Sequence, residues 1–218
     1  VLGLSATPSE KGDTWTIKLR QGVTFHDGTP FNADAVVSHW ERILDPMNRY
    51  RERIQILPIL AVEKTGEFEV KFHLKYFWAP FTAVLTNSNG LAAPIPSPAA
   101  VEKDMQQRTP VGTGPFIFSD WKSGNQIVLK KNPTYWQKGK PYLDEIVFIV
   151  MQDQEAQYST LVAGQADMLV TDRPAQIKRL LDNPDFASWI NNHRGAFILA
   201  LNNAKPPLDD VRVRNALA

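Results

Sequence analysis

Hydrophobic residues follow two different patterns along the chain. In residues 14–20 and 68–75, apolar and polar side chains alternate, which is the period of a strand with one buried and one exposed face. In residues 146–151 and 196–201, apolar side chains are nearly continuous, which is typical of strands covered on both faces. The chain is therefore expected to combine half-exposed strands with a sheet that is buried more fully.

Helices are predicted between these strands. Asn32 can cap a helix whose apolar residues recur at helical spacing. Ser97 followed by Pro98 predicts the start of a second helix. Further helices are expected at residues 154–163 and 174–181. Because strands and helices alternate in the second half of the chain, the predicted fold class is α/β.

The length of 218 residues suggests one large domain or two small ones. Residues 109–115, rich in Gly and Pro, are the best candidate for a boundary, which divides the chain into residues 1–108 and 109–218. Val1 is not a methionine, no signal segment follows it, and residues 215–218 lie inside a predicted helix. The sequence is therefore interpreted as a fragment that is cut at both ends.

Composition excludes several classes of chemistry. The absence of cysteine excludes disulfides, Cys-ligated zinc, iron–sulfur clusters and thiol nucleophiles. With 24 Lys and Arg against 23 Asp and Glu, the chain lacks the basic surplus of a nucleic-acid-binding protein. The histidines have no short spacing that would hold a metal, so we expect surface or packed imidazoles at His26, His39, His73 and His193. No metal, no cofactor and no nucleic-acid partner is expected.

Catalytic groups are not indicated either. Two pairs of neighbouring carboxylates, Asp144-Glu145 and Asp209-Asp210, would support hydrolysis only with a second carboxylate facing them across a cleft. They are interpreted as solvated charges, and a hydrolase that uses one of them is the alternative from another functional class. The glycines in residues 112–114 are not followed by the Lys and Ser or Thr of a phosphate-binding loop.

Residues 77–101 contain no Asp, Glu, Lys or Arg. This segment cannot cross a membrane as one helix, because it contains four prolines and an Asn-Ser-Asn-Gly sequence that favours a turn. An uncharged segment of this length is expected to be sheltered by protein. It forms either part of the core or the wall of a cleft.

A long ungapped segment carries a family resemblance. Residues 14–36 read TWTIKLRQGVTFHDGTPFNADAV and resemble the signature of the family 5 extracellular solute-binding proteins, the peptide- and nickel-binding receptors of ABC importers. Further segments similar to markers of this family are residues 111–116, 131–136, 164–167, 202–203 and 211–217. The resemblance therefore extends over essentially the whole chain.

The resemblance implies a periplasmic-binding-protein-like (class II) fold, in which two lobes close on a solute and present it to a membrane permease. Residues 1–108 would be the small α/β subdomain of lobe one, and residues 109–218 part of its main sheet domain, truncated at the hinge. The second lobe is missing. No covalent chemistry is implied.

The resemblance also implies a place and a partner. The parent protein would lie in the periplasm or on the outer face of the cell membrane, peripheral to the membrane, with a signal or lipid anchor outside this fragment. Its solute would be a di- or oligopeptide, with nickel chelates and oligosaccharides as alternatives within the family. A pure interaction scaffold is a third class.

Two positions depart from the family pattern. Many relatives carry an aromatic residue where this chain has Ala6. Residues 87–95 contain no Arg, although some receptors for metal complexes carry one in this segment, which weakens a nickel-chelate assignment.

A ligand-binding site is expected on the uncharged segment. Short amides and hydroxyls can orient a ligand's backbone without the cost of burying a charge, and Gly90 permits close approach of the chain. The alternative is a buried turn that satisfies only its own backbone. The candidate ligand-binding residues are Trp78, Asn87, Ser88, Asn89, Gly90 and Thr113.

Overall fold

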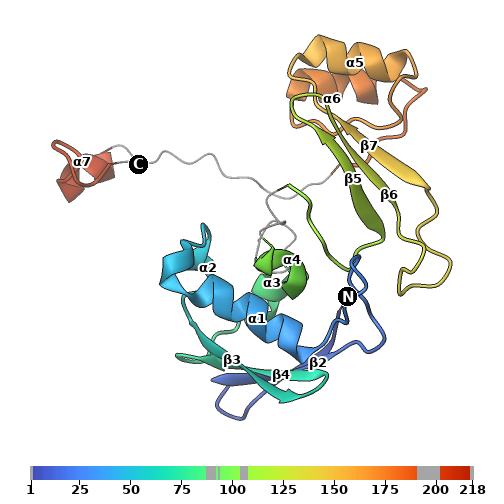
Figure 1. The fold of residues 1–218 in the computed structure, drawn as a ribbon. Helices are drawn as coiled ribbons and strands as arrows, with labels where there is room; N and C mark the ends of the chain where they lie inside the picture. Colours follow the sequence, from blue (N-terminus) through green and yellow to red (C-terminus); the bar gives the residue numbers. More distant parts are fainter. Residues whose placement is uncertain (1, 87–91, 93, 104–107, 191–201, 217–218) are drawn as a thin grey trace. The chain divides into compact units, whose positions relative to one another are not determined.

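The computed structural model describes residues 2–86, 92, 94–103, 108–190 and 202–216. The chain divides into two compact units, residues 1–151 and residues 152–218. Figure 1 shows the first unit as two antiparallel sheets with helices, and the second as helices. The subdomain boundary expected at residues 108 and 109 stays a prediction.

A four-stranded antiparallel sheet occupies the first half of the chain. Its strand order is β1-β2-β4-β3, with bounds Gly3–Pro8 for β1, Thr14–Leu19 for β2, Ile59–Gly66 for β3 and Glu69–Leu74 for β4. Buried residues occupy every second position of β4, and Ile17 and Leu19 are buried in β2 while Lys18 between them is exposed. Both strands predicted from alternation are confirmed.

Helix α1, Ala33–Leu44, covers one face of this sheet (Figure 1). The Asn32 side chain caps it by accepting a hydrogen bond from the Ala35 N–H at 3.1 Å, as the sequence predicted. The Trp40 ring packs edge-on against the Phe72 ring of β4, with 5.1 Å between centroids. Both side chains are almost fully buried. The core of the first unit therefore lies between α1 and the sheet.

Shorter elements connect the strands. Residues 26–28 form a turn, in which the Gly28 N–H donates to the Phe25 carbonyl. Gly28 has a φ of +83°, a left-handed conformation that favours glycine. Ser97 caps the predicted helix by accepting from the Ala100 N–H. The short helices are η1 (Pro46–Asn48), α2 (Arg53–Ile56), α3 (Phe81–Thr86) and α4 (Pro98–Glu102).

A three-stranded antiparallel sheet completes the first unit, in the order β5-β6-β7, with bounds Phe116–Lys122, Gln126–Lys131 and Glu145–Ile149. The strand predicted at residues 146–151 is present, but the prediction that both its faces are covered is wrong. Val147, Phe148 and Ile149 are 41%, 51% and 47% exposed. Val147 and Ile149 point to one face of the sheet and Phe148 to the other, so neither face of β7 is fully covered by another element.

The second unit contains the two helices predicted at residues 154–163 and 174–181. They are α5 (Gln154–Val162) and α6 (Pro174–Leu181), and a third helix, α7, spans Val211–Ala216. The buried Gln176 amide joins α6 to α5 by donating to the Gln154 carbonyl at 2.8 Å. The strand predicted at residues 196–201 lies outside the described residues. In the part of the chain that the structure describes, no helix has the length and apolar character needed to span a membrane.

Candidate functional site

The candidate ligand-binding residues occupy separate places. Trp78 is half-buried, and its ring lies 6.4 Å from the Phe81 ring. Thr113 is half-buried in the loop that precedes β5. Residues 87–90 lie outside the described residues. The structure therefore places two of the six candidates, and no hydrogen bond or ring contact between described residues joins Trp78 to Thr113.

The uncharged segment is sheltered only in part. Phe81 and Ser97 are completely buried, and Ala100 is nearly so. Phe77 is 63% exposed, so the expectation of shelter is wrong at this residue. Its ring lies against the backbone of Gly12, where an added Cβ would come within 2.2 Å of the ring. Phe77 therefore covers a turn at the surface and not the core.

An apolar groove of about 360 Å³ lies beside the sheltered part of this segment. Its walls come from β1, β2, β4, α1 and α3, and they include Leu4, Ala6, Leu85 and Thr86. The volume lies within the range of small-molecule pockets. Thr86 directly precedes the candidate residues 87–90 in the sequence. Ala6, where the family resemblance led us to expect an aromatic residue, is part of the wall of this groove.

A network of polar contacts surrounds residues 112–114, which we call the glycine loop. The His26 N–H donates to the Gly112 carbonyl at 2.8 Å. Nδ1 of the His26 ring accepts from the Gly112 N–H at 3.4 Å, and Nε2 lies 3.0 Å from the Gly114 carbonyl oxygen. The tautomer that carries its proton on Nε2 satisfies both contacts, because Nδ1 then accepts and Nε2 donates. His26 therefore contacts the loop on both sides of Thr113.

Asp27 ties the same turn to helix α4. Its carboxylate accepts a short hydrogen bond from the Ser97 hydroxyl and bonds from the Thr29 hydroxyl and N–H at 2.6 and 3.0 Å. Partial burial raises the pKa of Asp27, but the hydrogen bonds from Ser97 and Thr29 outweigh it, so the pKa lies below its ordinary value. The Ser97 N–H donates to the Val111 carbonyl at 3.0 Å, directly before the glycine loop.

Asn132 holds the glycine loop from the other side. Only 3% of this residue is exposed, and its side-chain amide donates to the Gly114 carbonyl at 3.1 Å. Its backbone N–H donates to the Pro115 carbonyl, and its side-chain oxygen accepts from Thr134. Sequence reasoning missed these roles of His26 and Asn132. The only signal for them is that both residues stand in segments that resemble family markers.

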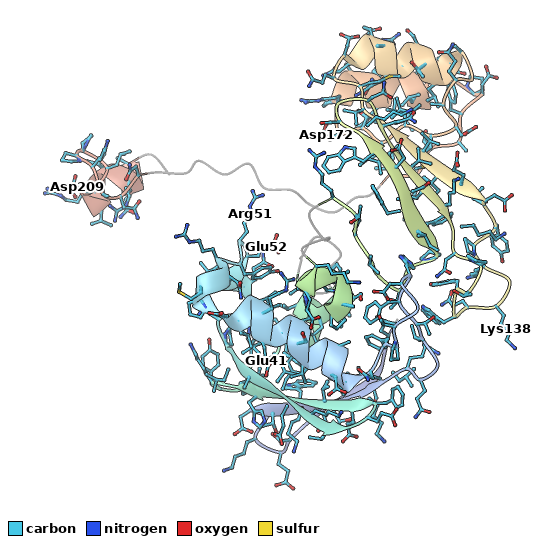
Figure 2. The ribbon with its side chains drawn as sticks, in the orientation of Figure 1. Glu41, Arg51, Glu52, Lys138, Asp172 and Asp209 are labelled. Carbon is cyan, nitrogen blue, oxygen red and sulfur yellow. The ribbon has the colours of Figure 1, made fainter. Side chains whose placement is uncertain are left out.

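The carboxylates that the sequence offered for hydrolysis lie at the surface. Asp144 is almost fully exposed beside Lys131, at 3.3 Å, and Asp209 is exposed on the surface near α7 (Figure 2). Both are solvated, as predicted. His73 is on the polar face of β4, where it pairs with the Glu63 carboxylate at 2.9 Å. Within the described ranges, no three His, Asp or Glu side chains come together as metal ligands would.

His39 is a packed imidazole, as predicted. It is 4% exposed, and its Nε2 lies 3.1 Å from the Ala92 carbonyl oxygen. Burial lowers the pKa of His39 to about 4, the hydrogen bond to Ala92 opposes this shift, and Arg42 adds to it. His39 is therefore neutral at physiological pH, and it links α1 to Ala92 of the uncharged segment. His193 lies outside the described residues.

Solved structures place this fold in the class of periplasmic binding proteins. The binding protein MoaA of A. tumefaciens R10, solved in complex with mannopinic acid, matches with a TM-score of 0.82 and 29% sequence identity. The match covers 100% of this chain and 44% of that one. The predicted fold class is confirmed, and the chain corresponds to part of the longer binding-protein fold.

The sequence model of the bacterial extracellular solute-binding proteins, family 5 Middle, matches residues 2–218. The chain belongs to this family, as the segment at residues 14–36 predicted. Di/tripeptide-binding protein 2 of Pseudomonas aeruginosa (strain UCBPP-PA14) is 32% identical over an alignment of 236 residues, which covers 96% of this chain and 43% of that protein. The glutathione-binding protein GsiB of Escherichia coli K12 is 32% identical over 100% of this chain and 42% of that protein. The chain thus spans less than half the length of these relatives.

Proposed function

We propose that this chain is part of lobe one of a receptor that binds di- or oligopeptides outside the cytoplasm and delivers them to an ABC permease. The observation that carries the proposal is membership of the solute-binding family over residues 2–218. The names of two relatives, at 32% identity, support peptides as the solute class, because glutathione is itself a tripeptide. The proposed role is binding without turnover.

The apolar groove supports this proposal, because its volume is that of a small-ligand pocket and its lining residues are uncharged. The apolar groove offers Leu4, Ala6 and Leu85 to an apolar side chain, with hydroxyls from Ser5 and Thr86 at its wall. Apolar walls with a few polar groups are typical of ligand pockets. In this proposal the groove, Trp78, residues 87–90 and Thr113 form one wall of a cleft, and the second lobe supplies the other.

The identity of the solute is tested on the full-length protein. Native mass spectrometry of the purified receptor is expected to detect a bound peptide. Calorimetry with the dipeptide Met-Leu, reduced glutathione and mannopinic acid then compares the candidate classes. Binding of mannopinic acid alone would contradict the peptide proposal, and hydrolysis of either peptide would contradict a receptor without turnover.

The two-lobe arrangement predicts a large difference in affinity. The 218-residue chain is expected to bind the solute of the parent receptor more than about a hundredfold more weakly, because about half of the contact area is lost with the second lobe. Calorimetry on both proteins measures this ratio. Equal affinities would contradict a site shared between lobes.

The candidate loop is tested by Asn87→Ala and Asn89→Ala in the full-length receptor. We propose that these amides contact the solute, so affinity is expected to fall while the melting temperature stays unchanged. The opposite result, lower stability with unchanged affinity, would show that the two residues only hold a turn.

Fractionation of cells tests the proposed location of the receptor outside the cytoplasm. A mature full-length protein found in the cytosol would contradict that location.

A further inference from the structure

Two segments far apart in the sequence hold the glycine loop by hydrogen bonds, one through His26 and the other through Asn132. The Gly114 carbonyl accepts hydrogen bonds from His26 and from Asn132, which uses both of its lone pairs. The N–H and the carbonyl of Gly112 are both bonded to His26. Gly112 and Gly114, the two neighbours of Thr113, are therefore both held by other segments of the protein.

One side chain remains available in this loop. Among the described residues, no hydrogen bond involves the Thr113 hydroxyl, although the residue is half-buried. Because both neighbouring glycines are held, the backbone of Thr113 is restricted, and with it the direction in which the hydroxyl can point. The orientation of Thr113 is consequently set by the groups that hold Gly112 and Gly114.

The His26 ring is suited to this task in the tautomer that carries its proton on Nε2. It carries one donor and one acceptor on a rigid ring, so it can bond the Gly114 carbonyl and the Gly112 N–H together. Lys and Arg carry donors only, and an ionised carboxylate only accepts. The neighbouring Asp27 fixes the turn that carries the ring through its bond with Ser97.

We propose that His26 is a positioning residue of the solute site, which orients the Thr113 hydroxyl toward the solute by holding Gly112 and Gly114. This inference rests on the proposed function, in which Thr113 belongs to the binding wall. It assigns the histidine of the family-like segment at residues 14–36 to the site, although His26 itself does not contact the solute.

The variants are made in the full-length receptor. His26→Leu removes both ring contacts at similar size. His26→Gln keeps an amide that can donate to the Gly114 carbonyl, and it is the conservative variant. Thr113→Val removes the hydroxyl that the ring positions. His73→Gln is the matched control, because it removes an imidazole that pairs with Glu63 on the exposed face of β4.

Two readouts require no ligand. In His26→Leu, hydrogen exchange of the peptide containing residues 109–116 is expected to accelerate about tenfold, because a hydrogen bond to Gly112 is lost. The NMR signal of the Thr113 methyl group is expected to shift toward a rotamer average. His73→Gln is expected to change neither quantity. If both readouts stay at their wild-type values in His26→Leu, the proposal is overturned.

Affinity for Met-Leu and reduced glutathione then tests the link to the solute. His26→Leu and Thr113→Val are each expected to lower affinity about tenfold, the usual effect of one lost hydrogen bond, and His26→Gln is expected to recover most of it. Because His26 acts through Thr113, the double variant is expected to bind no more weakly than either single variant.

The remaining outcomes separate this inference from the proposed function. Additive losses in the double variant, or faster exchange with unchanged affinity, would reduce His26 to a structural residue and overturn the inference. If the wild-type receptor binds neither probe, the peptide proposal fails. The exchange rate and the methyl signal then decide alone whether His26 positions Thr113.

Discussion

The two sheets of the first unit are both antiparallel, and both contain strongly apolar strands, but they are covered to different extents. In the four-stranded sheet, Val70 and Phe72 are at most 1% exposed beneath α1. In the three-stranded sheet, Phe148 and Ile149 of β7 are about half exposed. The difference shows that an apolar strand is buried only where another element lies over it.

The difference has an energetic consequence. Burial of apolar surface is favourable by about 25 cal/mol per Å², so it stabilises a sheet only where a neighbour removes water from it. The Trp40 ring of α1 removes water from Phe72, with which it forms an edge-on aromatic pair. The first sheet, together with α1, therefore contributes most to the stability of the 218-residue chain. Substitutions in the core between them are expected to lower the free energy of unfolding the most.

The largest effect is expected for a pair of truncations, one in the helix that covers the first sheet and one in the second sheet. Trp40→Ala is expected to lower the free energy of unfolding by about 3–5 kcal/mol, because it removes a buried aromatic side chain and leaves a cavity. Phe148→Ala is expected to cost about 1 kcal/mol or less, because the ring already contacts water. Urea unfolding of the chain, followed by circular dichroism, measures both. Equal losses would contradict the difference between the sheets.

The buried histidine provides a pH test of the covered sheet. The pKa of His39 is lowered to about 4 in the folded chain, against about 6.5 in the unfolded chain. Between these values the unfolded chain binds the additional proton, so stability falls as the pH is lowered from 6.5 toward 4. The contribution of this residue is about 3 kcal/mol over that window.

The variant for this test is His39→Gln, which can still donate to the Ala92 carbonyl but does not titrate. Its free energy of unfolding is expected to depend less on pH between 6.5 and 4 than that of the wild type. Urea unfolding at pH 7, 6, 5 and 4 gives the two slopes. Identical slopes would show that His39 is not the source of acid sensitivity.

The smallest effects are expected for a helix cap and for an exposed ion pair. Asn32→Ala removes the side chain that accepts from the Ala35 N–H, and it is expected to cost about 1 kcal/mol. Lys131→Ala, which breaks an exposed ion pair with Asp144 at the second sheet, is expected to leave stability within measurement error. A larger loss for Lys131→Ala than for Asn32→Ala would reverse the comparison between the two sheets.

Local patterns predicted the elements well. The start of α1 was expected from Asn32, and α6 spans the predicted residues 174–181. Helix caps and hydrophobic periodicity are determined by residues a few positions apart, so the sequence contains the required information. The candidate site was predicted less completely. Residues 77–101 drew attention to Trp78, but nothing in their composition identified the groove formed with β1.

The sequence by itself determined the family, the elements and the absence of cysteine chemistry, because each depends on residue types at short separations. Only the tertiary structure decided that β7 is exposed and that the His26 ring contacts Gly112 and Gly114. His26 is separated from Gly112 by 86 positions in the sequence and from Gly114 by 88. No period or spacing in one sequence encodes such a pairing, because it depends on how the turn, α4 and the loop before β5 come together in space.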